Sequence, residues 1–376
     1  MMRLSSVRLV LPDEVVDGHL VVEDGKIAGF GSGPAGGEDL EGDFLIPGLV
    51  ELHTDHLEVH VAPRPGVRWN ITAAVQAHDA QIAASGITTV LDALRVGLDG
   101  DGTLTSQDGR DIADAIMAAQ EANRLRAEHR FHLRCEVSSE SAVPDFALFD
   151  DLEAVDLISL MDHTPGQRQF RSLDAYRLYF QRNTGMTDAE FELFQAERRA
   201  RADKWSDRNR RALAGLGKSR GAVIASHDDA TTEHVAEAVR DGVTLAEFPT
   251  TVEAADASRA AGMKVLMGGP NLVRGGSHSG NVSAGELADR GALDILSSDY
   301  VPFSMLQGAF ALSDREDWSL PAAVVTVTAA PAGAVGLTDR GRIEEGARAD
   351  LVRVRRTAPG DVPIVLGVWR EGRRVA

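Results

Sequence analysis

The stretch PGLVELHTDHLEVH, residues 47–60, carries the strongest structural signal in the sequence. A short apolar run, typical of a buried strand, ends there in histidine and aspartate. His53 and Asp55 are two positions apart, so a strand places both side chains on one face. His56 points the other way unless the strand has already ended. Asp55 is therefore the better candidate for a site beside His53, while His56 stays open as a ligand or as a partner of one. We expect His60 in a loop.

Further apolar runs follow the first one and alternate with segments of helical pattern. In residues 109–129, for example, Ile112 and Ile116 share one face of a helix. Ser283 and Glu286 have the spacing of a capping box that starts a short helix. Eight strands alternating with helices predict an α/β fold, a (β/α)8 TIM-like barrel rather than an open sheet. The eight runs are 48–54, 88–94, 131–137, 155–161, 222–227, 243–249, 264–269 and 293–299.

The two ends of the chain resemble each other and differ from the middle. Residues 5–46 and 341–376 both contain short strand signals punctuated by glycine and turn dipeptides. Neither end has enough strands for a stable sheet of its own. We therefore predict a small composite β-sandwich domain built from residues 1–46 and 340–376, and a catalytic barrel over residues 47–339.

One connection of the predicted barrel is much longer than the others. Residues 164–218 separate the fourth and fifth strands, and Thr187 with Glu190 has the spacing of a capping box. Long insertions at a barrel mouth often cover a site, so we interpret this segment as a helical lid. A contact between subunits is the alternative, and a homodimer, common for such barrels, stays open.

Composition excludes several classes of protein. The 376 residues are 43% hydrophobic and 26% charged, which is typical of a folded globular protein. Lys and Arg number 39 against 57 Asp and Glu, a net charge of −18, so binding to nucleic acid or an anionic membrane is not expected. Cys135 is the single cysteine. The first residues, MMRLSSVRLVLPDE, lack the apolar core of a signal peptide, so we expect none, and no apolar run is long enough to span a membrane. We expect a cytoplasmic protein.

Histidine and acidic side chains stand where the predicted strands end, the place at which barrel enzymes carry their chemistry. Imidazole and carboxylate groups are the ligands of Zn²⁺ and similar ions, and two such ions activate water for hydrolysis. We predict two divalent ions, Zn²⁺ first, with Mn²⁺, Fe²⁺ or Ni²⁺ open. Glu136 would suit a carboxylate shared between them, and Asp299 is the expected general base. The candidate ligands are His53, Asp55, Glu136, His163, His227 and Asp299, with His56 as an alternative.

Other titratable groups receive different roles. Asp162, Asp228 and Asp229 are adjacent alternatives to these acids, and we expect them to orient the ligands. Four further histidines fall in the small domain or on predicted helices, where we expect solvated side chains. These are His19, His78, His129 and His234.

The loop GGPNLVRGGSHSGN, residues 268–281, follows the seventh predicted strand. Its glycines allow the backbone to approach a ligand, and its N–H groups could bind an anion. A purely structural loop is the alternative, and the sequence has no Walker A motif. The residues that would bind a phosphorylated substrate are Arg274, Ser277, His278 and Asn281, with Arg168 from the insertion.

Longer motifs resemble the amidohydrolase superfamily over nearly the whole chain. They are VVEDGKIAGFG, PGLVELHTDH and the closing VTAAPAGAVGLTDRGRIEEGARADLV. The resemblance implies a metal-dependent hydrolase barrel beside a composite β domain. The chain departs from the common pattern in three places. His53-Thr54-Asp55 replaces His-x-His, the carbamylated lysine of the fourth strand is absent, and EFPT stands where the sixth strand usually has histidine.

A second set of motifs resembles the phosphonate-metabolism members of that superfamily. It comprises HTDHLE, HLRCE, LMDHTPGQRQF, ASHDD, PNLVRGGSHSGN and SSDYVP. This resemblance implies hydrolysis of α-D-ribose 1-methylphosphonate 5-triphosphate, a small phosphorylated sugar phosphonate, to the 5-phosphate and pyrophosphate. A C–N hydrolase of the same superfamily (cyclic amidase, deacetylase or deaminase) is the alternative, and a catalytically silent assembly protein on this fold is the more distant one.

Overall fold

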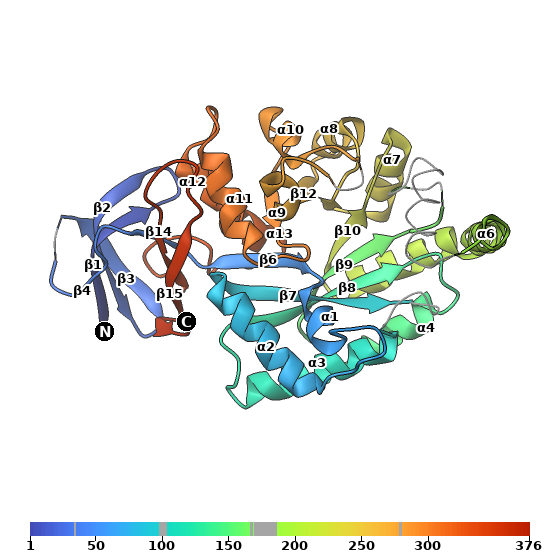
Figure 1. The fold of residues 1–376 in the computed structure, drawn as a ribbon, viewed down its shortest axis with the longest axis horizontal. Helices are drawn as coiled ribbons and strands as arrows, with labels where there is room; N and C mark the ends of the chain where they lie inside the picture. The colour runs from blue at the N-terminus through green and yellow to red at the C-terminus, as the bar shows by residue number, and fades with distance from the viewer. Residues whose placement is uncertain (34, 98–103, 166–167, 169–185, 278–279) are drawn as a thin grey trace.

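The computed structural model describes residues 1–33, 35–97, 104–165, 168, 186–277 and 280–376. One of its two eight-stranded sheets is parallel, and its strands follow one another in chain order from β6 to β13 (Figure 1). All eight predicted runs overlap these strands, so the predicted barrel is confirmed. The bounds are β6 (Leu49–Thr54), β7 (Ile87–Val96), β8 (Glu128–Glu136), β9 (Val155–Met161), β10 (Val223–His227), β11 (Leu245–Glu247), β12 (Lys264–Gly268) and β13 (Ile295–Ser297).

The barrel closes where its first and last strands end. Thr54 forms a parallel bridge with Asp299. The Asp299 N–H donates to the carbonyl of His53 at 3.0 Å, and the Asp55 N–H donates to the carbonyl of Asp299 at 2.8 Å. Closure therefore brings together side chains from the two ends of the barrel sequence.

Apolar side chains fill the barrel interior below these strand ends. The inward-facing residues form one buried cluster, as expected for a packed barrel that has no pore. They include Val50, Leu52, Leu91, Leu157, Ala225, Leu245, Leu266 and Ile295. The histidines and carboxylates of the candidate site lie above this apolar layer, toward the carboxyl ends of the strands.

Helices surround the barrel (Figure 1). Thr187 and Glu190 form the predicted capping box, and the Ser283 hydroxyl accepts the Glu286 N–H as predicted. The helices are α1 (His56–Val61), α2 (Ile71–Ala84), α3 (Ser106–Glu121), α4 (Ala142–Phe146), the 3-10 turn η1 (Ala147–Phe149), α6 (Asp188–Ser219), α7 (Thr232–Asp241), α8 (Val252–Ala260), α9 (Gly269–Val273), α10 (Ala284–Asp289), α11 (Ser304–Ser313), α12 (Leu320–Val325) and α13 (Ala329–Ala334).

The second half of the long helix α6 serves as an ordinary barrel helix. Leu213 is buried, and a Cβ at Gly217 would lie 2.4 Å from Ile224 Cδ1 and 2.7 Å from Ile158 Cδ1. Glycine thus lets α6 approach β9 and β10 closely. The lid role of the whole insertion stays a prediction, because residues 166–167 and 169–185 lie outside the described part of the chain.

A second, mostly antiparallel sheet combines both ends of the chain and confirms the composite β domain. Its strands follow the path β16-β15-β14-β5-β1-β2-β3, and β4 pairs with β1 beside that path. The domain bounds at residues 46–47 and 339–340 stay a prediction. The strands are β1 (Met2–Val10), β2 (Val15–Glu23), β3 (Lys26–Ser32), β4 (Glu38–Asp39), β5 (Phe44–Pro47), β14 (Leu351–Arg355), β15 (Ile364–Arg370) and β16 (Arg373–Arg374).

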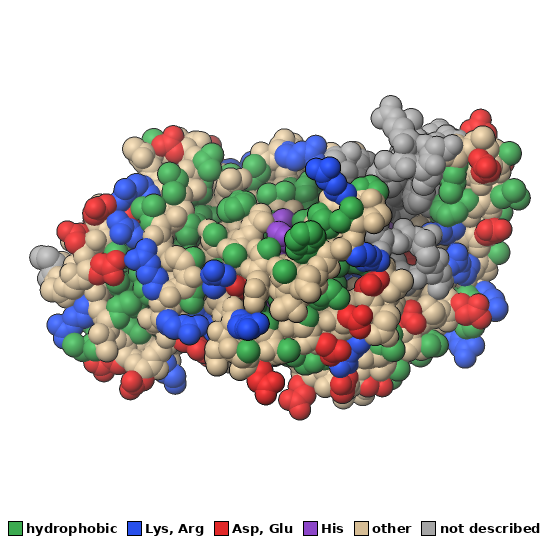
Figure 2. Space-filling view, turned by 60° about the horizontal axis from the view of Figure 1, so that its bottom comes forward, with side chains coloured by type: hydrophobic (Ala, Val, Ile, Leu, Met, Phe, Trp, Pro, Cys, Tyr) green, Lys and Arg blue, Asp and Glu red, His purple; other side chains and the backbone are tan. Residues whose placement is uncertain are grey.

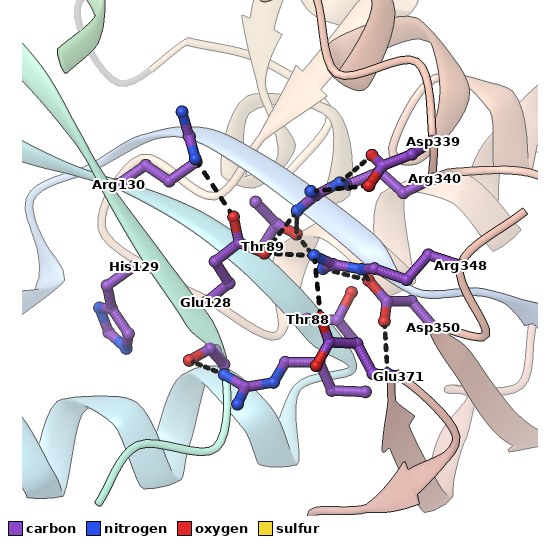
Figure 3. Close-up of polar contacts among 12 residues, drawn as sticks. Thr88, Thr89, Glu128, His129, Arg130, Asp339, Arg340, Arg348, Asp350 and Glu371 are labelled. Carbon is purple, nitrogen blue, oxygen red and sulfur yellow. Dashed lines mark hydrogen bonds and ion pairs between the residues drawn. The ribbon is translucent and has the colours of Figure 1, made fainter. Parts of the chain in front are cut away.

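The small sheet meets the barrel at the amino ends of the barrel strands. Glu128, at the start of β8, accepts hydrogen bonds from the guanidinium groups of Arg340 and Arg348 (Figure 3). Arg348 also pairs with Asp350, next to β14, and Arg340 donates to Thr89 Oγ1 at 3.0 Å. We refer to these five residues as the junction network. It ties the two sheets together at the end of the barrel opposite the candidate site.

The surface has a mixed character. Acidic and basic side chains alternate over the described part of the face in Figure 2. Among the described residues, no helix has the length and apolar character needed to cross a membrane.

Candidate metal centre

The predicted ligands meet at the carboxyl end of the barrel. Potential ligand atoms of His53, Asp55 and Asp299 lie within 4.8 Å of one another. A second group, with the same spacing limit, contains His163, His227 and Asp228. The rings of His53 and His227 stack at 5.7 Å between centroids, so the two groups adjoin. Together they make one candidate centre with room for two ligand sets.

Backbone strain helps to place two of these carboxylates. Asp228 directly follows β10, and Asp299 comes one residue later after β13, separated from it by Ser298. The two aspartates adopt left-handed φ values of 58° and 55°. Non-glycine residues rarely adopt this conformation, although aspartate tolerates it better than most. The turn ends each strand abruptly. Burial raises the pKa of Asp299 above its ordinary value, and the charge of Asp55 adds to the rise.

Glu247, which sequence reasoning did not select, organises the centre from below. It ends β11 and is fully buried. Its two carboxylate oxygens accept from Nδ1 of His53 and from Nδ1 of His227, both at 2.6 Å. Since Nδ1 carries the proton in each ring, Nε2 is the atom left for a ligand or a metal. The signal was available as the glutamate of the EFPT motif, at the end of a predicted strand.

Glu136 holds His163 in the structure. One of its oxygens accepts from His163 Nδ1 at 2.7 Å, and the other accepts from Ser138 Oγ at 2.6 Å and from the His163 N–H at 3.2 Å. It belongs to neither group of converging ligand atoms above. Its role as a carboxylate shared by two ions stays a prediction.

Arg134 brings positive charge to the same place. Its guanidinium donates to Asp55, and the Arg95 guanidinium lies 3.8 Å from the other oxygen of that carboxylate. Burial alone would raise the pKa of Asp55, but Arg134, His53 and Arg95 lower it well below its ordinary value. Arg134 itself is buried, so its charge faces the centre rather than solvent. Sequence reasoning did not identify it, because on β8 it reads as one charged residue within an apolar run.

His56 and His60 lie outside the two groups. The strand ends at Thr54, and His56 is the first residue of α1, where it faces His60. Of Asp55 and His56, it is thus Asp55 that joins His53 and Asp299. His60 lies in α1, so the expectation of a loop was wrong. The expectation of solvated side chains was also wrong for His78 and His129, which are 0% and 1% exposed.

The predicted substrate residues are more dispersed. Arg168 is buried between Asp229 and Glu237 and pairs with both. Arg274 is exposed at the end of α9. Ser277 and Asn281 are half-buried, and His278 lies outside the described residues. Their contact with substrate stays a prediction.

Comparisons with known proteins extend the picture. Residues 184–376 match the model of the amidohydrolase family. The chain is 49% identical, over 100% of both chains, to the α-D-ribose 1-methylphosphonate 5-triphosphate diphosphatase of Escherichia coli strain K12. It is 26% identical to the imidazolonepropionase of Streptomyces griseus, over 96% of this chain and 91% of that one. The N-acetyl-D-glucosamine-6-phosphate deacetylase of Mycobacterium smegmatis shares the fold, with a TM-score of 0.64 at 16% identity over 100% of both chains.

Proposed function

The chain belongs to the amidohydrolase family, and from that premise we propose that it hydrolyses α-D-ribose 1-methylphosphonate 5-triphosphate to the 5-phosphate and pyrophosphate. The observation that carries the proposal is the 49% identity to the E. coli diphosphatase over the full length of both chains. The clustered histidines and carboxylates at the barrel mouth supply the groups that such a hydrolysis needs.

The donor set fits divalent metal ions. His53 and His227 are buried with Nδ1 committed to Glu247, and Asp228 Oδ2 is buried without a hydrogen-bond partner. An unpaired buried carboxylate oxygen is costly unless a cation or a donor meets it. Of the two ligand sets, His53, Asp55 and Asp299 would hold one ion, and His163, His227 and Asp228 the other. Zn²⁺ suits these ligands best, with Mn²⁺, Fe²⁺ and Ni²⁺ as alternatives.

Bound ions would polarise a phosphoryl oxygen and make the attacking water more acidic. Asp299 would accept the proton of that water at its carboxylate as the new P–O bond forms. The anhydride P–O bond then breaks, and pyrophosphate leaves with its electron pair. Arg134 would neutralise negative charge that builds on the phosphoryl oxygens. Glu247 and Glu136 would keep the histidine rings in place throughout.

The glycine-rich loop would bind the anionic ends of the substrate, and Arg168 would support it less directly. Arg274 is exposed at the end of α9, the short helix that follows β12. An exposed guanidinium group there suits contact with phosphate or phosphonate oxygens. Arg168 is buried with two acidic partners, so its contribution would be to position the start of the insertion.

The C–N hydrolase alternative has less support. The deacetylase that resembles this chain does so at 16% identity, which extends to the fold alone. The imidazolonepropionase match, at 26% identity, is weaker than the full-length match to the diphosphatase.

Phosphorus NMR of the metal-loaded protein tests the proposal. With ribose 1-methylphosphonate 5-triphosphate we expect one pyrophosphate for each substrate consumed and no reaction after treatment with a chelator. Inorganic phosphate as the first product, or an unchanged substrate at full metal occupancy, would contradict it. Release of amine or acid from amide substrates by the same sample would favour the alternative.

A further inference from the structure

Two arginines lie side by side at the mouth of the barrel. Arg95 on β7 and Arg134 on β8 occupy matching positions of two neighbouring parallel strands. Side chains alternate between the two faces of a strand, so Arg95 shares the face of Leu91, four residues earlier. Leu91 belongs to the apolar cluster inside the barrel. Arg95 therefore points inward near the carboxyl end of β7, where the candidate metal centre lies.

The two arginines approach different oxygens of one carboxylate. Arg134 Nη1 donates to Asp55 Oδ1, whereas Arg95 Nη2 lies 3.8 Å from Asp55 Oδ2, which is longer than a hydrogen bond. Arg95 Nε lies 2.6 Å from Glu58 Oε1 on α1. The guanidinium of Arg95 is thus anchored at its Nε edge, and its Nη2 atom faces the centre without a hydrogen bond to Asp55.

Arg95 is the more accessible of the pair. Its side chain is 33% exposed, whereas that of Arg134 is 8% exposed, so a ligand in the barrel mouth can reach Arg95 directly. Asp55 is a candidate ligand of the first ion, which would share its negative charge. Two guanidinium groups beside a metal ion would make this part of the mouth positively charged, although the whole chain is acidic. A local field of this sign suits a polyphosphate.

We propose that Arg95 determines specificity by binding non-bridging oxygens of the substrate triphosphate through its Nη atoms, beside Arg134. This inference rests on the proposed function and adds the group that recognises the polyphosphate chain. A guanidinium presents paired N–H donors that match phosphate oxygens, and such charge-assisted hydrogen bonds are stronger than neutral ones. The uncharged carbonyl group of an amide would gain much less from it. Arg95 therefore favours a phosphoanhydride over the substrate of a C–N hydrolase.

The affinity of matched variants for an uncleavable substrate analogue tests this role. In the analogue, a CH2 group replaces the oxygen between the α and β phosphorus atoms of ribose 1-methylphosphonate 5-triphosphate. Isothermal titration calorimetry of the metal-loaded protein gives its Kd. We expect Arg95→Gln to raise Kd by about 10–100-fold, because a charge-assisted contact is lost. Arg95→Lys should recover only part of the affinity, since an ammonium group does not reproduce the paired donors.

Arg259→Gln is the control variant. Arg259 is also partly exposed, at 40%, and pairs with a carboxylate, that of Asp294. Asp294 directly precedes β13, so this pair lies at the amino end of the barrel, away from the candidate site. The control should bind the analogue as the wild type does.

Bound metal and pyrophosphate release are measured in the same samples. An unchanged Kd in Arg95→Gln would overturn the inference. A Kd that rises only in proportion to lost metal would also overturn it, because Arg95 would then support Asp55 and not the substrate. If the metal-loaded wild type releases no pyrophosphate from the triphosphate, the proposed function itself fails. If the wild type does so and the Arg95 variants bind normally, this inference alone fails.

A crystal structure of the wild type with the analogue covers the case in which the Arg95 variants do not fold. We expect a phosphoryl oxygen within about 3.2 Å of an Arg95 Nη atom. A bound triphosphate with no oxygen in contact with Arg95 would overturn the inference.

Discussion

The two ends of the barrel both bury charged side chains, but they balance them differently. In the junction network at the amino end, Glu128 faces Arg340 and Arg348, and Arg348 also pairs with Asp350 (Figure 3). At the carboxyl end, Asp228 Oδ2 accepts no hydrogen bond, and its nearest charged partner is His227 Nε2 at 3.4 Å, itself a candidate ligand atom. At the amino end, carboxylates and guanidinium groups pair with each other and hold the two sheets together. At the carboxyl end, a buried carboxylate oxygen without a hydrogen bond remains available to a ligand.

The pKa values of Glu128 and Asp299 differ in the same way between the two ends. Burial alone would raise the pKa of Glu128, but Arg348 and Arg340 lower it to about 2. Burial raises the pKa of Asp299 instead, with further help from Asp55. The first carboxylate is stabilised as an anion by its neighbours. The second is held in a place where its charge is costly unless a cation is present.

The largest expected effect is on turnover at the carboxyl end. Asp299→Asn removes the proposed proton acceptor and should lower kcat by about 10²–10⁴-fold. Pyrophosphate release, followed by phosphorus NMR, measures the loss. The other ligands remain, so most of the bound metal should be kept. A variant with near-normal turnover would show that Asp299 is not the base.

At the junction, the largest effect should be on stability. Glu128→Gln leaves two buried guanidinium groups without their shared anion, which should cost about 3 kcal/mol of unfolding free energy, the low end for a broken buried pair. Urea unfolding followed by circular dichroism measures this cost. Turnover per folded molecule should stay unchanged, because the junction lies at the opposite end of the barrel. A loss of turnover in the folded variant would mean that the two ends are coupled.

Glu247 lies at the carboxyl end but, like Glu128, has partners for its charge. Its two oxygens accept hydrogen bonds from His53 and His227. Glu247→Gln keeps the shape but weakens the hold on His53 and His227, and should lower metal affinity by about 10–100-fold. Competition with a chromophoric chelator measures that affinity. Glu253→Gln, on the exposed start of α8, is the control and should bind metal as the wild type does.

The smallest effect is a dependence on pH. The pKa of Glu128 is lowered to about 2 in the folded protein, so its stabilising contribution is present above the ordinary glutamate pKa and is lost as the pH falls toward 2. The difference in stability between wild type and Glu128→Gln should therefore shrink by about 1–2 kcal/mol between pH 5 and pH 3. A difference that does not change over this range would show that the two arginines do not lower this pKa.

Much of the fold was predictable because barrel strands are short buried apolar runs, and each run leaves a local signal. The same signal located His53, His163, His227 and Asp299, since strand ends converge at one edge. Glu247 and Arg134 were harder to identify because their roles depend on partners from other strands. His78 and His129 were assigned wrongly. His78 lies on α2 and His129 near the start of β8, and a single histidine in either element gives no sign that it faces a buried carboxylate such as Asp92.

The most direct test of the account is the position of bound metal. Crystals of the zinc-loaded protein would be measured at the zinc absorption edge, and anomalous difference density would locate each ion. The account predicts peaks at the carboxyl end of the barrel, beside His53, Asp55 and Asp299 and beside His163, His227 and Asp228. Zinc-loaded crystals without density at either place would contradict it. Asp55, Asp228 and Asp299 would then have a structural role and would not be metal ligands.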